Sequence, residues 1–455
     1  MIESRSPYTV QLTAQYQHFS NEKIEQCLAD VVEYATRYRH SDWTYRQKRL
    51  LTVASNLRTR KYELAELITS EMGKLISESL AEIEKCAWVC EYYAEKGRDF
   101  LGAERTTTDA SSSGVLYVPL GTVLAIMPWN FPFWQVFRFA APAVMAGNTM
   151  LLKHSSIVPR CALEIESIFN ESGFDGPVIK QVFATKEQIS HLIADDRIAA
   201  VTLTGSEAAG KSIAKEAGYH LKKVVLELGG SDPYIVLDDA DLDLAVEACV
   251  KGRMLNTGQS CIGAKRFIIQ SGIYDEFLQK FRVKMSSFSF GDPMNNKTTL
   301  GPLASIKQRE DLHEQVLTAV ANGAHLMVGG YVPDEIEGAF YPATILTEVD
   351  QANPIYSEEV FGPVAMVFRV DDVDQAIALA NDTSFGLGAA IFSKNTEMAQ
   401  SIAETRLDAG SCFINAQVKS DPRLPFGGIK KSGFGRELSM HGIREFTNIK
   451  TIYRK

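Results

Sequence analysis

Hydrophobic residues recur at helical spacing across residues 21–101, for example in KRLLTVASNLRTRKYELAELITSEMGK. This spacing predicts a mostly helical segment. From residue 122 to residue 228 the pattern changes to short apolar runs, which are TVLAIMPW, TMLLK, KQVFAT, AAVTLTGS and KVVLEL. Helical segments separate these runs. Such alternation predicts a parallel sheet with crossover helices.

A second series of apolar runs lies between about residues 229 and 430, and it reads YIVL, RFIIQ, AMVFRV, GAAIFS and CFINA. Helical segments separate these runs as well. Residues 104–121 are rich in Thr and Ser and predict an extended, projecting hairpin. The tail REFTNIKTIYRK predicts a helix end followed by a terminal strand. We therefore expect an α/β protein with two sheets and a small additional β element.

Composition narrows the class of protein. Of the 455 residues, 45% are hydrophobic and 23% charged, and the net charge of −9 includes no long basic run, which argues against nucleic acid as a partner. No apolar run reaches about 18 residues, so we expect no membrane span, and the N-terminus has no apolar signal core. The seven cysteines have no zinc-finger spacing. We expect a cytoplasmic protein with no bound metal.

The predicted strands of the first series end in polar or glycine-rich sequences, namely PWN, KHSS, TGSEAAGK and LELGG. In parallel sheets, ligands bind beyond the carboxyl ends of the strands. One of these ends, GSEAAGKS at residues 205–212, also matches the phosphate loop of nucleotide hydrolases, and the Asp after YIVL could hold magnesium. Against a P-loop NTPase, the interior SEAA has no glycine and Glu207 adds negative charge beside phosphates. The start of this predicted helix could equally receive the pyrophosphate of a dinucleotide, although no GxGxxG is present.

Three residues are candidates for chemistry. Cys261 follows NTGQS, a polar loop that suits an exposed nucleophilic thiolate, although a structural cysteine is the alternative. Glu227 stands in the apolar run before two glycines, where desolvation would raise its pKa toward that of a general base; a buried salt bridge is the alternative. Asn130, in MPWNFP, offers an amide that could bind an oxyanion or could simply form a turn.

Five motifs, PWNFP, LELGG, NTGQSC, EEVFGP and PFGGIKKSGFGRE, occur in an order and spacing that resemble the aldehyde dehydrogenase superfamily over roughly residues 15–455. The resemblance implies that Cys261 attacks an aldehyde carbonyl. Asn130 and the backbone N–H of Cys261 would then hold the oxyanion, hydride would pass to a nicotinamide, and Glu227 would activate the water that hydrolyses the resulting thioester.

The resemblance also implies a domain organisation. A Rossmann-like cofactor domain would comprise residues 1–103 and 122–228, and a second α/β catalytic domain residues 229–436. Residues 104–121 and 437–455 would form a small β oligomerisation element. We accordingly expect a homodimer or a homotetramer.

For the cofactor, the resemblance places Lys153 and Ser156 at the adenosine ribose. NAD-preferring members commonly have Glu at the second position, and this carboxylate would repel a 2′-phosphate to which a hydroxyl can donate. We therefore expect NADP to be preferred, with NAD tolerated. His154 would be solvated at the surface or touch the phosphate. The other cofactor-binding residues implied are Trp129, Gly205, Ser206, Leu228, Glu359 and Phe361.

For the substrate, Arg138 stands eight residues after Asn130. The arginine at this separation binds the distal carboxylate in succinate-semialdehyde dehydrogenases of the family. Ser420 would be a second carboxylate donor. We therefore expect succinate semialdehyde as substrate, with broad aldehyde specificity as the alternative. A structural salt bridge is the other interpretation of Arg138, and Leu255 stands where some members carry another arginine.

Overall fold

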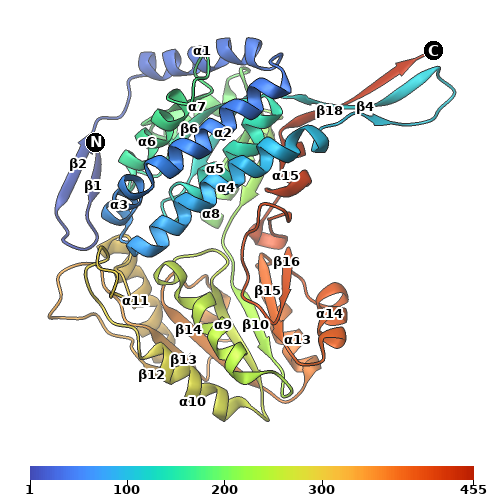
Figure 1. Ribbon diagram of the computed structural model, residues 1–455. Helices are drawn as coiled ribbons and strands as arrows, with labels where there is room; N and C mark the ends of the chain where they lie inside the picture. Colours follow the sequence, from blue (N-terminus) through green and yellow to red (C-terminus); the bar gives the residue numbers. More distant parts are fainter.

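A computed structural model describes residues 1–455 and contains two large sheets, one above the other in Figure 1. The N-terminal half begins with an antiparallel hairpin, β1 (Ile2–Arg5) and β2 (Leu12–Tyr16), which the sequence pattern did not predict. The helices predicted across residues 21–101 are confirmed as α1 (Asn21–Tyr38), α2 (Trp43–Thr59), α3 (Lys61–Met72) and α4 (Ile76–Phe100). No helix is both long and apolar enough to cross a bilayer.

The first sheet has six strands in the order β17-β9-β8-β5-β6-β7, all parallel except β17. All five apolar runs predicted between residues 122 and 228 form its strands. They are β5 (Thr122–Met127), β6 (Thr149–His154), β7 (Ile179–Gln181), β8 (Ile198–Thr204) and β9 (Lys223–Glu227). The crossover helices are α5 (Trp134–Ala146), α6 (Pro159–Asn170), α7 (Lys186–Ala194) and α8 (Glu207–Tyr219).

The strand order reverses between β5 and β8. The chain adds β6 and β7 on one side of β5, then returns to add β8 and β9 on the other. The two strands end together, since Ile126 pairs with Leu203, and the PWN and GS sequences follow directly. A reversal of this kind opens a crevice between the connecting loops, where open α/β sheets bind their ligands.

The second sheet has seven strands in the order β12-β13-β14-β11-β10-β15-β16. The five runs predicted between residues 229 and 430 are β10 (Asp232–Val236), β11 (Ala264–Gln270), β14 (Val364–Val370), β15 (Gly388–Phe392) and β16 (Ser411–Ile414). The sequence pattern missed the edge strand β12 (His325–Val328) and its neighbour β13 (Thr344–Thr347). The helices here are α9 (Leu242–Met254), α10 (Tyr274–Met285), α11 (Ile306–Ala321), α12 (Pro354–Ser357), α13 (Val373–Asn381) and α14 (Thr396–Thr405).

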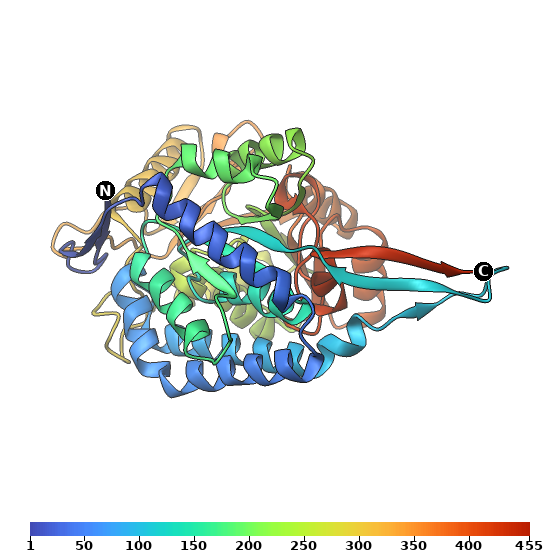
Figure 2. The same cartoon turned by 90° about the horizontal axis from the view of Figure 1, so that it is seen from above.

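The C-terminal segment contacts the first sheet and then leaves the body of the molecule. The two-residue strand β17 (Gly433–Phe434) pairs with the end of β9. After α15 (Ser439–Glu445), strand β18 (Thr447–Arg454) pairs antiparallel with β4 (Ser112–Pro119), which also pairs with β3 (Glu104–Arg105). This three-stranded sheet projects from the body, as the sequence predicted (Figures 1 and 2). The expected domain boundaries stay a prediction.

Candidate active site

Cys261 ends a loop that is built by its own polar residues. Asn256 and Thr257 both have left-handed backbone conformations, with φ of 55° and 54°, and Gly258 follows with φ of 73°. Gly258 also packs closely on the chain, because a Cβ there would lie 2.2 Å from the carbonyl oxygen of Gly362. Three consecutive residues of this conformation turn the chain sharply from α9 toward Cys261.

Hydrogen bonds hold this loop against the turn after β5. The amide Nδ2 of Asn256 donates to the carbonyl oxygens of Asn130 (2.7 Å) and Gln259 (3.2 Å), and its backbone N–H donates to Glu78 Oε1 at 2.8 Å. The side chain of Gln259 accepts from the N–H of Ala304 at 2.8 Å. These bonds explain why small polar residues surround a cysteine. Their side chains form the hydrogen bonds that a buried loop needs, and the thiol stands at the end of this loop.

Asn130 lies beside this loop. It is buried, and its Nδ2 donates to the carbonyl oxygen of Gln259 at 3.1 Å, which fixes the plane of the amide. The turn that carries Asn130 is anchored by Glu82 of α4, whose carboxylate accepts the N–H groups of Phe133 and Trp134 at 2.9 Å each. Glu82 also pairs with the buried Lys74. Neither Glu82 nor Lys74 could be found from the sequence, because nothing in a helical pattern marks a carboxylate that caps a distant helix.

Glu227 ends β9 and is buried, with no hydrogen-bond partner for either carboxylate oxygen. Burial raises the pKa of this carboxyl well above its usual range; the charge of Arg138 opposes the shift and that of Glu437 adds to it. A carboxyl of raised pKa without a fixed partner suits a general base that exchanges a proton with water. The direct salt bridge considered for Glu227 is absent.

The thiol of Cys261 is partly exposed, and burial of its surroundings raises its pKa to about 11, against the opposing charges of Arg138 and Lys265. Lys265 is fully buried. Its Nζ donates to the carbonyl oxygens of Ser260 (3.0 Å) and Cys261 (2.7 Å), and it lies 3.6 Å from Glu359 Oε1. No sequence motif marked Lys265, although it lies four residues after the cysteine.

A cavity of about 250 Å³ opens in front of Cys261. Its edge includes Trp129 and Phe361, whose rings meet edge to face with centroids 5.8 Å apart. Eight of the residues singled out in the sequence line it, and they are Trp129, Asn130, Gly205, Ser206, Leu228, Cys261, Glu359 and Phe361. The lining residues that the sequence analysis did not name are Pro128, Gln135, Thr204, Gly229 and Gln308.

Lys153 and Ser156 lie outside this cavity, at and just beyond the end of β6. Lys153 is half-buried and Ser156 exposed. Burial and the nearby Lys186 lower the pKa of Lys153, and no carboxylate pairs with it. The expectation for His154 is wrong: this side chain is buried, its Nε2 lies 2.8 Å from the carbonyl oxygen of Pro132, and burial lowers its pKa to about 4. It joins the end of β6 to the turn after β5.

The two predicted substrate-binding residues have different surroundings. Arg138, on α5, is buried in an ion pair with Glu437, and its guanidinium lies 4.4 Å from the ring centroid of Phe426. The structural salt bridge considered for this arginine is therefore present. Ser420 is buried, and its Oγ accepts a hydrogen bond from Lys85 Nζ at 2.7 Å.

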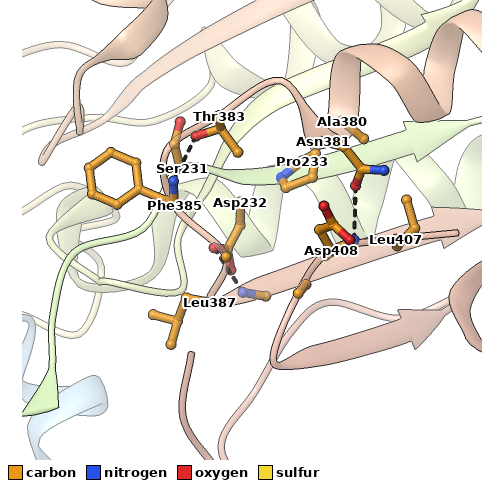
Figure 3. A pocket seen from close by; sticks show the side chains of 14 residues that line it. Ser231, Asp232, Pro233, Ala380, Asn381, Thr383, Phe385, Leu387, Leu407 and Asp408 are labelled. Atoms are coloured by element: carbon orange, nitrogen blue, oxygen red, sulfur yellow. Dashed lines mark hydrogen bonds between the residues drawn. The ribbon is translucent and has the colours of Figure 1, made fainter. Parts of the chain in front are cut away.

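A second, much smaller cavity of about 10 Å³ lies beside Asp232, at the start of β10 (Figure 3). Asp232 Oδ1 accepts the N–H of Gly388 at 3.1 Å, and burial raises the pKa of its carboxyl to about 7. The nearby Asn381 accepts the N–H of Asp408 at 2.9 Å. This space is no larger than a water molecule needs, so it holds no substrate. No group of three or more His, Cys, Asp or Glu side chains is arranged to hold a metal.

A Rossmann-like sheet whose switch point faces a loop cysteine and an amide donor, with a buried carboxyl at the end of a neighbouring strand, is typical of one class of protein: nicotinamide-dependent oxidoreductases with a thiol nucleophile. The sequence profile of the aldehyde dehydrogenase family matches residues 1–452. The chain belongs to this family and is an NAD(P)-dependent enzyme.

Three similar proteins are all named as succinate-semialdehyde dehydrogenases. The chain is 49% identical over 452 residues to a probable NADP+ succinate-semialdehyde dehydrogenase of Synechocystis sp., which covers 99% of each chain. It is 47% identical over 419 residues to an NAD(P)+ succinate semialdehyde dehydrogenase of Escherichia coli, covering 92% of this chain and 90% of the relative. The crystal structure of a Streptococcus pyogenes succinic semialdehyde dehydrogenase with NADP+ matches with a TM-score of 0.97 at 40% identity, covering 100% and 99%.

The P-loop NTPase alternative does not fit. The GSEAAGKS segment begins α8, where Lys211 pairs with Glu207 of the same helix and points into solvent. The Asp after YIVL follows β10, which belongs to the other sheet. The segment therefore lacks both the phosphate-facing lysine and the neighbouring magnesium ligand of a P-loop.

Proposed function

We propose that the enzyme oxidises succinate semialdehyde to succinate, with NADP+ preferred and NAD+ tolerated as hydride acceptor. The observation that carries this proposal is the convergence of Cys261 and Asn130 on one cavity, with Glu227 directly before its lining residue Leu228. The names of the relatives supply the substrate and the cofactor. In balance, the aldehyde, NADP+ and one water give the carboxylate, NADPH and two protons.

The first steps of the reaction use the loop that ends at Cys261 and the turn after β5 that carries Asn130. The thiolate of Cys261 attacks the aldehyde carbon and gives a thiohemiacetal. The amide of Asn130 and the backbone N–H of Cys261 donate to the oxygen that becomes negative. Bound NADP+ would supply the hydride acceptor, and loss of hydride from this carbon would leave a thioester on Cys261.

Glu227 acts in the second half of the reaction, which is the hydrolysis of the thioester. Its raised pKa and unpartnered oxygens favour removal of a proton from the water that attacks the thioester. Hydrolysis releases succinate and restores the thiol. A thioester-transferring relative would need another acceptor in place of this water.

The residues present fit a dinucleotide with a 2′-phosphate. The cavity before Cys261 suits the nicotinamide ribose, with Glu359 at its edge, and Gly205 and Ser206 at the start of α8 suit the pyrophosphate. Lys153, in β6, has no carboxylate partner and lies near Lys186. These two positive charges would attract the 2′-phosphate. Ser156 adds a hydroxyl donor where a carboxylate would repel the phosphate.

Arg138 and Ser420 would recognise the carboxylate of succinate semialdehyde. Arg138 lies close enough to Cys261 for its charge to lower the pKa of the thiol. Because Glu437 already neutralises one side of the guanidinium, Arg138 would share this role with another cation.

The enzyme would work as a homodimer or homotetramer in the cytoplasm. The projecting sheet exposes apolar side chains of β18, with Ile449 65% and Tyr453 50% exposed, and such residues suit an interface. All seven cysteines are free, which fits a reducing compartment.

A substrate panel on purified protein tests the proposal. Absorbance at 340 nm follows the reduced cofactor with succinate semialdehyde, pentanal and benzaldehyde, each with NADP+ and with NAD+. We expect the highest kcat/KM with succinate semialdehyde and NADP+. Equal kcat/KM for the three aldehydes would instead indicate a broad-specificity enzyme.

A further inference from the structure

Lys85, on α4, is a cation without a carboxylate partner beside the predicted substrate site. Its Nζ donates to Ser420 Oγ at 2.7 Å and lies over the ring of Trp134, 4.1 Å from the centroid. Trp134 is the first residue of α5, one turn before Arg138. Lys85 therefore contacts Ser420 directly and lies near Arg138, the two residues that the family resemblance assigns to the substrate carboxylate.

The carboxylates nearest to Lys85 are engaged elsewhere. Glu82, on the same helix, pairs with Lys74 and caps α5. Asp421 is held by Arg423, whose Nε and Nη2 donate to it at 2.8 Å and 2.7 Å. Arg138, which faces Lys85 from α5, only adds positive charge. The ammonium of Lys85 thus has no direct carboxylate partner. Burial, reinforced by Arg138, lowers its pKa to about 8, against the opposing charges of Cys86, Glu82 and Asp421.

A buried ammonium without a direct carboxylate partner is stabilised by an anion that enters with the ligand. Its hydrogen bond to Ser420 uses one of three donors. Ser420 accepts that bond, so its own hydroxyl hydrogen stays available to a second acceptor. A carboxylate fits this pair, because one oxygen can accept from Lys85 and the other from Ser420. Arg138 differs, since Glu437 already balances its charge.

We propose that Lys85 is a specificity-determining residue that binds the distal carboxylate of the substrate together with Ser420. This proposal rests on the proposed function. It supplies the second cation of the carboxylate site in a chain where Leu255 occupies the position at which some family members carry an arginine.

The test compares two aldehydes of similar length, succinate semialdehyde and the uncharged pentanal. In Lys85→Met, kcat/KM for succinate semialdehyde should fall at least about tenfold, which is the loss of one charge-assisted hydrogen bond, while kcat/KM for pentanal stays within about twofold. Lys85→Arg keeps the charge and should retain most of the preference. Lys96→Met, which removes an exposed lysine from the same helix, should change neither value.

A pH profile of the unmodified enzyme tests the same residue without a mutation. Lys85 is charged below its pKa and neutral above it, so the ratio of kcat/KM for succinate semialdehyde to that for pentanal should fall as the pH rises through about 8. Groups that act on both aldehydes, such as Cys261, cancel in this ratio.

The outcomes distinguish the proposed function from the proposed role of Lys85. Equal use of both aldehydes by the unmodified enzyme would remove the proposed function itself. A clear preference for succinate semialdehyde that persists in Lys85→Met and stays constant across this pH range would overturn the assignment of Lys85 alone.

Discussion

Lys265 Nζ donates a hydrogen bond to the carbonyl oxygen of Cys261 at 2.7 Å, from a position with no solvent exposure. The lysine therefore fixes the backbone of the nucleophile loop and places a positive charge near the thiol. Glu359 lies 3.6 Å from the same Nζ, which connects this charge to a residue predicted to bind the cofactor ribose.

This relationship predicts an alkaline shift in the reactivity of Cys261 when the charge is removed. In the cofactor-free enzyme, burial raises the pKa of the thiol to about 11 and Lys265 opposes the rise. Alkylation by iodoacetamide should therefore accelerate with pH up to about 11. Lys265→Met should move the lower part of this profile, where the lysine is still charged, to higher pH, because burial lowers the pKa of Lys265 itself. Lys251→Met removes an exposed lysine from α9 and should leave it in place. Identical profiles in Lys265→Met and the unmodified enzyme would contradict this role.

Cofactor preference should respond to a single carboxylate at residue 156. In Ser156→Glu the new negative charge would repel the 2′-phosphate, so KM for NADP+ should rise at least about tenfold while KM for NAD+ changes less than about threefold. Ser156→Ala is the matched control, because it removes the hydroxyl without adding charge, and its effect should be smaller. Initial rates at saturating aldehyde measure both constants. An unchanged ratio of the two KM values would show that residue 156 does not face the phosphate.

The projecting sheet should carry subunit contacts. Ile449 is 65% exposed on β18, and side chains along a strand alternate between faces, so its neighbour Asn448 points the other way. Ile449→Asp should shift the enzyme toward monomer in size-exclusion chromatography with light scattering. Asn448→Asp adds the same charge on the opposite face and should preserve the assembly. A monomeric unmodified enzyme would refute the expectation directly.

Much of the fold was predictable because of where its strands lie. Both large sheets are mostly parallel and buried on both faces, so strands such as β5 and β8 are continuous apolar runs. The edge strand β12 and its neighbour β13 were missed because each is four residues long and neither forms a long apolar run. The buried His154 was misjudged for a related reason: its polar neighbours in KHSS suggested a surface, whereas the turn after β5 covers it.

The candidate site could be located from the sequence to the extent that its residues stand in local motifs, and the roles of these residues stay predictions. Cys261, Asn130 and Glu227 each sit in a short sequence with its own chemical signal. Lys85 and Glu82 do not, since each is a single charged residue in an ordinary helical pattern. Their contacts arise only when α4 packs against α5 and the loop of Ser420, which tertiary structure alone brings together.

The account depends most on a covalent intermediate at one sulfur, and Glu227→Gln can accumulate it. With the base removed, succinate semialdehyde and NADP+ should give a burst of NADPH equal to the enzyme concentration, followed by turnover at least about 100-fold slower. Mass spectrometry of the quenched, digested protein should then find a succinyl group on the peptide that contains Cys261. A burst without that adduct, or an adduct on another residue, would contradict the mechanism.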